Sequence, residues 1–289
     1  MRNPSPSPVV VGVTGTSAGL AAVRLAAREA VSRGRELRVV HAFTWPSPRP
    51  SAPGLDYDQA RRAASQVVEE AVATAQRSTP GVPVTGQLVD GLPDRMLVQL
   101  SRRAEVLVLG DDDLATTPWL PSTSVLVQTT AHAWCPVMVA RGPRPPGGPV
   151  VAAVDGSSCA LVALRAAVAE ARRRHAPLDV VHVVRDTGAA AEAEGRRVLA
   201  AARAAVPEVA DARTRLLTGT AGPALVRASG HGRLIVLGPR GTRGAGLLGT
   251  VAREVLHRGA CPTVFVHGRA LPAQRIPSGT ARNRDAIAR

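Results

Sequence analysis

The feature that most constrains the fold is an internal repeat that runs through most of the 289 residues. VVVGVTGT at 9–16 matches VVAAVDGS at 150–157, and VVHAF at 39–43 matches VVHVV at 180–184 with the same offset. WCPVMVARG at 134–142 matches ACPTVFVHG at 260–268 with a smaller offset, because the first copy has longer loops. A repeat of this length predicts two related domains. We place them at 1–144 and 145–268, followed by a basic tail at 269–289 that we expect to be disordered.

Each copy alternates short valine-rich runs with alanine-rich amphipathic segments. The expected strands of the first copy are 9–13, 38–43, 84–89, 106–109 and 136–140. The expected helices of the two copies are 18–34, 56–76, 93–103, 123–132, 159–174, 191–206, 223–232 and 250–259. Strands that are apolar on both faces indicate a parallel sheet covered by helices on both sides. The predicted fold class is α/β, with two tandem doubly wound, Rossmann-like parallel-sheet domains.

Composition narrows the function classes. All 36 basic residues are arginine and outnumber 22 acidic residues, giving a net charge of +14. We interpret the arginine excess as a general compositional bias, and the six aromatic residues argue against a stacking surface for single-stranded nucleic acid. No apolar run reaches the roughly 20 residues of a membrane span, and no signal peptide is evident. Three cysteines without CxxC spacing argue against disulfides or zinc, so we expect a soluble cytoplasmic protein.

Three motifs of the second copy follow predicted strands. Asp155 ends the first strand, Val183 lies near the end of the second, and the glycine-rich stretch 237–251 follows the fourth. Ligands of doubly wound sheets bind at the carboxyl ends of strands. Glycines let the backbone approach a ligand, and a helix N-terminus attracts anions. Thr250 is expected to cap that helix and to donate to a phosphate. The alternative is a plain strand–loop–helix connection in which the glycines only permit the turn.

These motifs resemble the universal stress protein family, over about residues 8–142 and 149–268. The shared elements are Val-Asp-Gly-Ser after the opening strand, Val-His-Val in the second, Leu-Gly-x-x-Gly after the fourth, a late Gly-Thr-Val, and Cys-Pro before the last strand. The resemblance implies an adenine-nucleotide α-hydrolase-like fold. It also implies ATP binding in members with a G-x2-G-x9-G-(S/T) pattern, and it implies that tandem members are built-in dimers.

By that resemblance, Asp155 would hold the adenosine end and Val183 would meet adenine through its backbone. The residues expected around the phosphates and ribose are Gly238, Arg240, Gly241, Gly249, Thr250 and Val251. One departure is that seven residues separate Gly241 from Gly249 where the family pattern has nine. Two missing residues shorten the reach of the loop by up to about 7 Å, so the cradle is remodelled or holds fewer phosphates. Mg²⁺ would accompany a bound triphosphate.

The first copy departs differently. Thr14 replaces the strand-end aspartate, and Asp113 and Thr123 replace two glycines of the cradle. Close like charges repel by about 1 kcal/mol even in water, so the run 111–113 disfavours a triphosphate. We therefore predict a nucleotide site in the second copy only. The acidic run is interpreted as a solvated loop, with a divalent cation as the alternative, and Pro118 and Trp119 as packing residues.

The resulting hypothesis is a stress-response protein that binds ATP as a conformational or partner-binding signal, with little or no turnover. The chain has no lysine for a Walker-type clamp and no G-x-S-x-G motif. His41 and His182 are expected to bond backbone rather than metal. The last strands, 137–140 and 263–266, are expected to pair between the repeats or in a homodimer. The alternatives are a scaffold that binds an unknown protein but no nucleotide, an α-hydrolase-like enzyme, and an arginine-based nucleic-acid binder.

Overall fold

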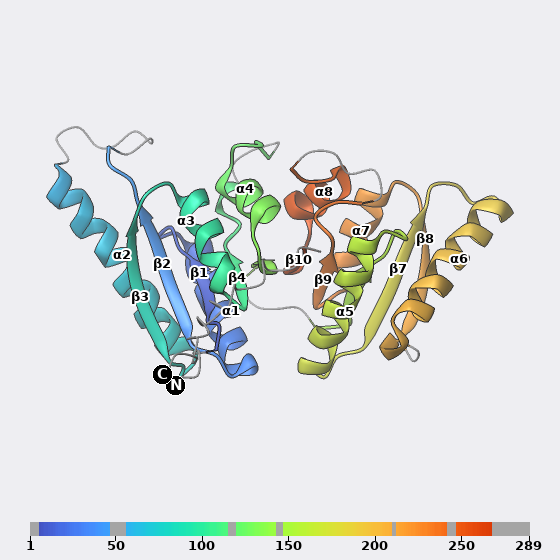
Figure 1. Ribbon diagram of the computed structural model, residues 1–289, viewed down its shortest axis with the longest axis horizontal. Helices are drawn as coiled ribbons and strands as arrows, with labels where there is room; N and C mark the ends of the chain where they lie inside the picture. The colour runs from blue at the N-terminus through green and yellow to red at the C-terminus, as the bar shows by residue number, and fades with distance from the viewer. Residues whose placement is uncertain are drawn as a thin grey trace, which may run out of the picture.

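The computed structural model describes residues 6–46, 56–114, 120–142, 147–209, 212–241 and 247–267. Within these ranges the chain forms one ten-stranded sheet with the order β3-β2-β1-β4-β5-β10-β9-β6-β7-β8. The first five strands and their helices form the first half, and the last five form the second half (Figure 1). Each half therefore has the strand order 3-2-1-4-5 of a doubly wound α/β fold, which confirms the predicted fold class.

The observed elements follow the predicted alternation of strand and helix. The strands are β1 Val9–Gly12, β2 Leu37–Phe43, β3 Val84–Asp90, β4 Val106–Leu109, β5 Val137–Val139, β6 Val150–Ala153, β7 Leu178–Val184, β8 Arg213–Thr218, β9 Leu234–Leu237 and β10 Thr263–Phe265. The helices are α1 Ser17–Arg33, α2 Tyr57–Ser78, α3 Pro93–Leu100, α4 Val125–His132, α5 Ser158–Arg173, α6 Ala189–Ala205, α7 Ala221–Ser229 and α8 Thr250–Arg258. None of the described helices is both long and apolar enough to cross a membrane.

Helices cover both faces of the sheet. On β1, Val9 and Val11 belong to a buried cluster on one face that includes residues of α1, α2, α5 and α6. Val10 points to the other face and packs with residues of α3, α4, α7 and α8. Each of these two clusters includes residues from both halves, so the apolar core is continuous across the molecule.

The third strand of the first copy is less buried than predicted. The stretch 84–89 was expected to be apolar on both faces, but in β3 only Val89 is buried. Its counterpart β8 has no buried residue at all. Both strands lie at the outer edges of the ten-stranded sheet, where one flank has no strand partner among the described residues. Their polar side chains suit such exposed edges.

The two halves join through their last strands. Antiparallel pairing aligns Thr263 with Val139, Val264 with Met138 and Phe265 with Val137, whereas every other described strand pair is parallel. Phe265 and Met138 are completely buried. The predicted contact between the last strands of the repeats is thus confirmed. Because β5 and β10 pair with each other within one chain, neither of them is an open edge of the sheet.

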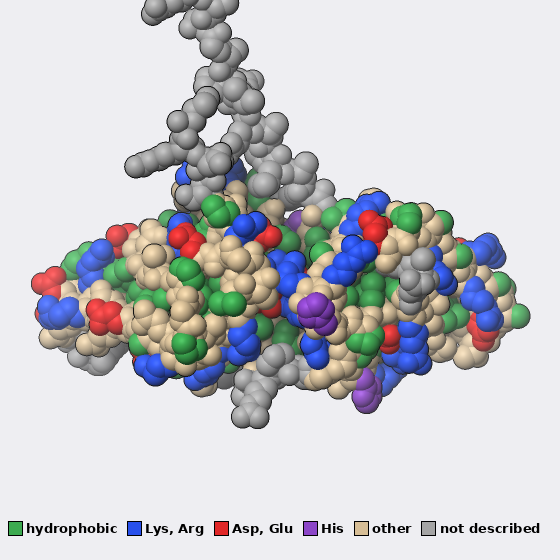
Figure 2. Space-filling view, turned by 90° about the horizontal axis from the view of Figure 1, so that it is seen from below, with side chains coloured by type: hydrophobic (Ala, Val, Ile, Leu, Met, Phe, Trp, Pro, Cys, Tyr) green, Lys and Arg blue, Asp and Glu red, His purple; other side chains and the backbone are tan. Residues whose placement is uncertain are grey.

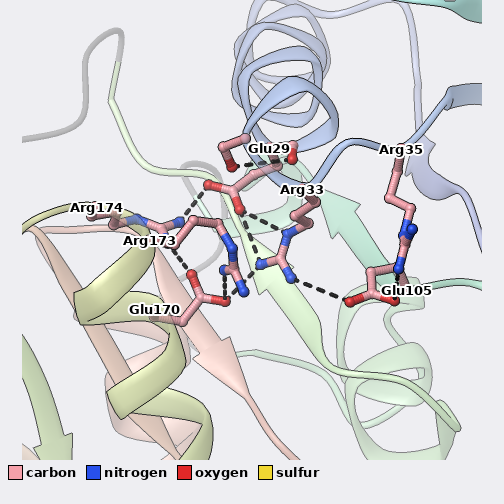
Figure 3. A network of polar contacts seen from close by, with 8 residues as sticks. Glu29, Arg33, Arg35, Glu105, Glu170, Arg173 and Arg174 are labelled. Carbon is pink, nitrogen blue, oxygen red and sulfur yellow. Dashed lines mark hydrogen bonds and ion pairs between the residues drawn. The ribbon is translucent and has the colours of Figure 1, made fainter.

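An ion-pair network also links the halves, on the side of α1 and α5 (Figure 3). Arg33 contacts Glu29 of its own helix at 3.0 Å and Glu170 of α5 at 2.6 Å. Arg174, just after α5, repeats this arrangement from the other half by contacting both glutamates. Both glutamates are buried, with 5% of their surface exposed. The four side chains therefore form a nearly two-fold symmetric cluster, which we call the junction square.

Two equivalent contacts also cross the junction on the opposite face, each from a residue just after a last strand. The Arg141 guanidinium follows β5 and donates to the carbonyl of Leu256 in α8. The His267 ring follows β10, and its Nε2 lies 2.6 Å from the carbonyl oxygen of Thr130 in α4. In the repeat alignment Arg141 corresponds to His267 and Leu256 to Thr130. Each half therefore contacts the equivalent backbone carbonyl of the other half, in one direction through an arginine and in the other through a histidine.

Candidate functional site

The topology brings the candidate residues of the second half to one edge. Strand order reverses between β6 and β9, which are hydrogen-bonded neighbours. Ala153 pairs with Val181, so Asp155 and Val183 both lie two residues further on at the same level of the sheet. Ala152 pairs with Val236, so Gly238 lies beside Val154. Carboxyl ends at such a switch point are where ligands of this fold class bind.

Asp155 and Gly241 lie in direct proximity. A methyl group built on Gly241 would come within 2.5 Å of Asp155 Oδ2. The other carboxylate oxygen of Asp155, Oδ1, accepts a hydrogen bond of 3.0 Å from the backbone N–H of Ser157. Both residues are exposed at the surface. Only glycine lets the segment after β9 approach the carboxylate this closely.

The segment after β9 also approaches α5 and returns on itself. A methyl group on Gly238 would lie 3.4 Å from Cβ of Cys159 in the first turn of α5. The backbone N–H of Gly249 donates to the carbonyl of Pro239 at 2.9 Å. Nε of Arg240 lies 3.4 Å from the carbonyl oxygen of Leu247, a long hydrogen bond directed within the same segment. Residues 242–246, including Arg243, Gly244 and Gly246, lie outside the described residues.

The expected capping role of Thr250 is wrong. Gly249 is the N-cap residue of α8, and Thr250 is already the first helical residue, with its side chain exposed and making no capping bond. In the first half the residue aligned with Thr250 is Ser124, and its hydroxyl caps α4 by accepting from Val127 N–H at 3.1 Å. The Thr250 side chain is therefore exposed on the first turn of α8. Val251 is half-buried and packs with the core.

The two equivalent histidines bond to backbone, as predicted. His41 Nδ1 lies 2.8 Å from the carbonyl oxygen of Val13, and His182 Nδ1 lies 2.8 Å from that of Val154. Each bond ties the second strand of its half to the turn after the first strand. Within the described residues, no group of three or more His, Cys, Asp or Glu side chains is placed to hold a metal ion.

The first half fills the equivalent place with its own carboxylate. Thr14 Oγ1 donates to Asp112 Oδ2 at 2.7 Å, and the Thr16 hydroxyl donates to the other carboxylate oxygen. Thr16 also caps α1, so Asp112 lies at the positive N-terminal end of that helix. Asp111 pairs with Arg141 at 3.3 Å. The acidic run was interpreted as a solvated loop, but two of its carboxylates are tied to the protein.

Two residues of the sites escaped the sequence analysis. Cys159 was considered only for disulfides and zinc, although it lies on the first turn of α5 against Gly238. The signal was its place four residues after Asp155, within reach of the same edge. Asp112 was treated only as a member of an acidic run. The available sign was Thr14 in place of the strand-end aspartate, with Thr16 two residues further on, since the two hydroxyls form a donor pair that can face a carboxylate.

The comparison with known families identifies the class of protein. The Universal stress protein family matches residues 7–141 and 148–267, which together are most of the chain. The chain therefore belongs to the universal stress protein family, with two tandem domains of that family.

Individual relatives agree with this assignment. The chain is 28% identical over 297 aligned residues to Universal stress protein Rv1996 of Mycobacterium tuberculosis, covering 89% of this chain and 93% of that protein. The crystal structure of a universal stress protein from Archaeoglobus fulgidus DSM 4304 covers 91% of this chain and 97% of its own, with a TM-score of 0.66 and 16% identity. At that identity the likeness supports the fold alone.

A third match covers only one half. A universal stress protein from Archaeoglobus fulgidus in complex with dAMP covers 46% of this chain and 96% of its own, with 21% identity and a TM-score of 0.35. The bound dAMP is a property of that protein.

Proposed function

We propose that the second half binds an adenine nucleotide, ATP with its Mg²⁺, between the end of β6 and the glycine-rich segment after β9. The observation that carries this proposal is the proximity of Gly241 to the exposed carboxylate of Asp155. It places an acceptor for ribose hydroxyls beside backbone that suits phosphates. Gly238, Gly249 and Thr250 border the same edge, and Val183 offers backbone at the level of Asp155.

The first half supports the assignment by contrast. Its Asp112 carboxylate already lies at the N-terminus of α1, held by Thr14 and Thr16. A phosphate at this place would face a negative charge at close range. The aligned residue of the second half is Arg240, which is cationic. We therefore assign the nucleotide to the second half and a supporting role to the first.

In this proposal, bound ATP acts as a signal. Asp155 is the acidic side chain of the site, and its Oδ1 is engaged by the N–H of Ser157. Retention of the nucleotide, with little or no hydrolysis, would then favour one arrangement of the segment after β9. That segment precedes α8, whose Leu256 carbonyl is bonded by Arg141 of the first half. A change at the nucleotide would thus reach the junction through one helix.

The test is thermal unfolding with and without ATP–Mg²⁺. A ligand at 100 times its Kd stabilises the native state by about 2.7 kcal/mol, which raises Tm by several degrees in a chain of this size. We expect Asp155→Ala to abolish the shift. The matched control is Thr14→Ala, the equivalent position of the first half, which should keep it. If wild type shows no shift at millimolar ATP, the nucleotide proposal fails and the scaffold function takes its place.

A further inference from the structure

A cavity of about 380 Å³ lies at the junction of the two halves, at the edge where the strands begin. Its lining includes Arg28 and Glu29 from α1, Arg174 after α5, Arg233 just before β9, and Pro262 just before β10. Figure 2 views the molecule from this edge and shows arginine side chains gathered on both sides of the middle. The cavity is therefore at the opposite edge of the sheet from the candidate nucleotide site.

The cavity carries more positive than negative charge. Among the described residues that line it, three are arginines and one, Glu29, is a carboxylate. Glu29 is already shared by Arg33 and Arg174 in the junction square. Arg174 is 14% exposed, and burial lowers the pKa of its guanidinium group, whereas Arg28 is exposed.

Arg233 lines this cavity, and its guanidinium group does not use all of its donors within the protein. Its Nη1 donates to the carbonyl oxygen of Arg174 at 3.2 Å. Its Nε is buried and has no hydrogen-bond partner among the described residues. A buried donor without a partner is unfavourable, so the protein alone does not satisfy the Arg233 guanidinium group.

Comparison of the two halves shows what the cavity lacks. The residue aligned with Arg233 is Glu105, and the N–H of each bonds a proline carbonyl at 2.8 Å, so the backbone is equivalent. Glu105 lies 3.8 Å from Arg33 and 3.9 Å from Arg35, and it neutralises that side of the junction square. On the other side, Arg233 stands beside Arg174 without such a carboxylate. Because the acid of the first half is a base in the second, this side of the junction carries excess positive charge that an anion would neutralise.

We propose that the junction cavity lined by Arg28, Arg174 and Arg233 binds a phosphate dianion, either inorganic phosphate or the phosphate group of a small metabolite. Guanidinium groups match phosphate oxygens with paired hydrogen bonds. The volume is within the range of small-molecule sites. Since both halves line the cavity, the bound anion would stabilise their mutual arrangement. The site is separate from the nucleotide site and does not depend on it.

The test is equilibrium dialysis of the full chain against radiolabelled inorganic phosphate, with chloride holding the ionic strength constant. Arg233→Glu should weaken binding at least about tenfold, since it removes a charged donor and supplies the carboxylate found in the first half. Arg62→Glu is the matched control, because it makes the same charge change at an exposed position of α2. It should change the affinity by less than about twofold.

Further measurements distinguish the two possible sources of the phosphate, and they distinguish failure of this proposal from failure of the nucleotide proposal. Unlabelled glycerol 3-phosphate that displaces the label more strongly than inorganic phosphate assigns the site to a phosphorylated metabolite, and weaker displacement assigns it to inorganic phosphate. Arg28→Gln provides a second lining variant if Arg233→Glu does not fold. Absence of saturable binding, or equal loss in the Arg62→Glu control, would overturn the proposal. The Asp155→Ala variant should bind phosphate as wild type does, which separates this site from the nucleotide proposal.

Discussion

Removal of Glu170 should destabilise the protein more than removal of any exposed glutamate. Its carboxylate contacts Arg33 at 2.6 Å and Arg173 at 2.7 Å, and it also contacts Arg174. Its side chain is 7% exposed, and those of Arg33 and Arg174 are 8% and 14% exposed. In Glu170→Ala, buried guanidinium groups from both halves lose their shared counter-ion.

The magnitude follows from burial. Removal of one partner from a buried ion pair costs about 3–5 kcal/mol, because the remaining charge stays out of water. Here Arg33 and Arg174 both keep Glu29, so we expect a loss of about 3 kcal/mol in the free energy of unfolding. The matched control is Glu194→Ala in α6, whose pair with Arg197 is 61% and 73% exposed. That pair should contribute less than about 1 kcal/mol.

The assay is urea unfolding at neutral pH, with the slope of the transition compared between variants. The double variant Glu29→Ala with Glu170→Ala should cost more than the sum of its parts, by roughly 0.5–3 kcal/mol, since each glutamate compensates for loss of the other. Equal losses in Glu170→Ala and Glu194→Ala would refute the reasoning. So would strict additivity in the double variant, because the four side chains would then act as separate pairs.

Three other results are expected. Burial raises the pKa of Cys135 and of Cys261 from 9.0 to about 12, so both thiols stay protonated when folded but ionise above pH 9 when unfolded. The free energy of unfolding from urea titrations should therefore fall between pH 9 and 12 by about 1.4 kcal/mol per pH unit for each thiol. In Cys135→Ala, which keeps one of the two thiols, this fall should be half as steep. Gly241→Ala places a methyl group 2.5 Å from a carboxylate oxygen and should abolish the ATP-induced Tm shift, whereas Gly188→Ala, with nothing within 4 Å, should keep it. Phe265→Ala should cost about 3–5 kcal/mol in urea unfolding, because the ring is completely buried where the halves join, and a loss below 1 kcal/mol would contradict this packing.

The architecture could be predicted because the repeat and the hydrophobic pattern are properties of the chain itself. The expected strand at 38–43 is observed as Leu37–Phe43, and the expected helix at 159–174 as Ser158–Arg173. The burial of β3 could not be read the same way, because an edge strand differs from a central one by what lies beside it. That depends on strand order, which is settled by long-range pairing.

The candidate site likewise has some features that the sequence predicts and others that depend on the path of a loop or on long-range pairing. Parallel strands place their carboxyl ends at one edge, so the sequence predicted that the acidic strand end and the glycine-rich segment belong to one rim. The hydrogen bonds from Thr14 and Thr16 to Asp112 depend on the path of a loop, and no spacing rule gives that path. Likewise, Glu29 with Arg33 reads in the sequence as an ordinary exposed pair at i and i+4. Only the β5–β10 pairing brings this pair against its counterpart from α5 and buries both.

Within this one chain, the two halves act as controls for each other. Positions that build the shared structure are the same in both: Glu29 and Glu170 in the junction square, and His41 and His182 beside the first strands. Two of the positions that differ in charge bear on binding, one at the rim of the candidate nucleotide site and one at the junction cavity. Thr14 is replaced there by Asp155, and Glu105 by Arg233. A charge change at a structurally equivalent backbone position alters what can bind while leaving the fold in place. The aligned positions 14/155 and 105/233 are therefore two at which a ligand would distinguish the halves.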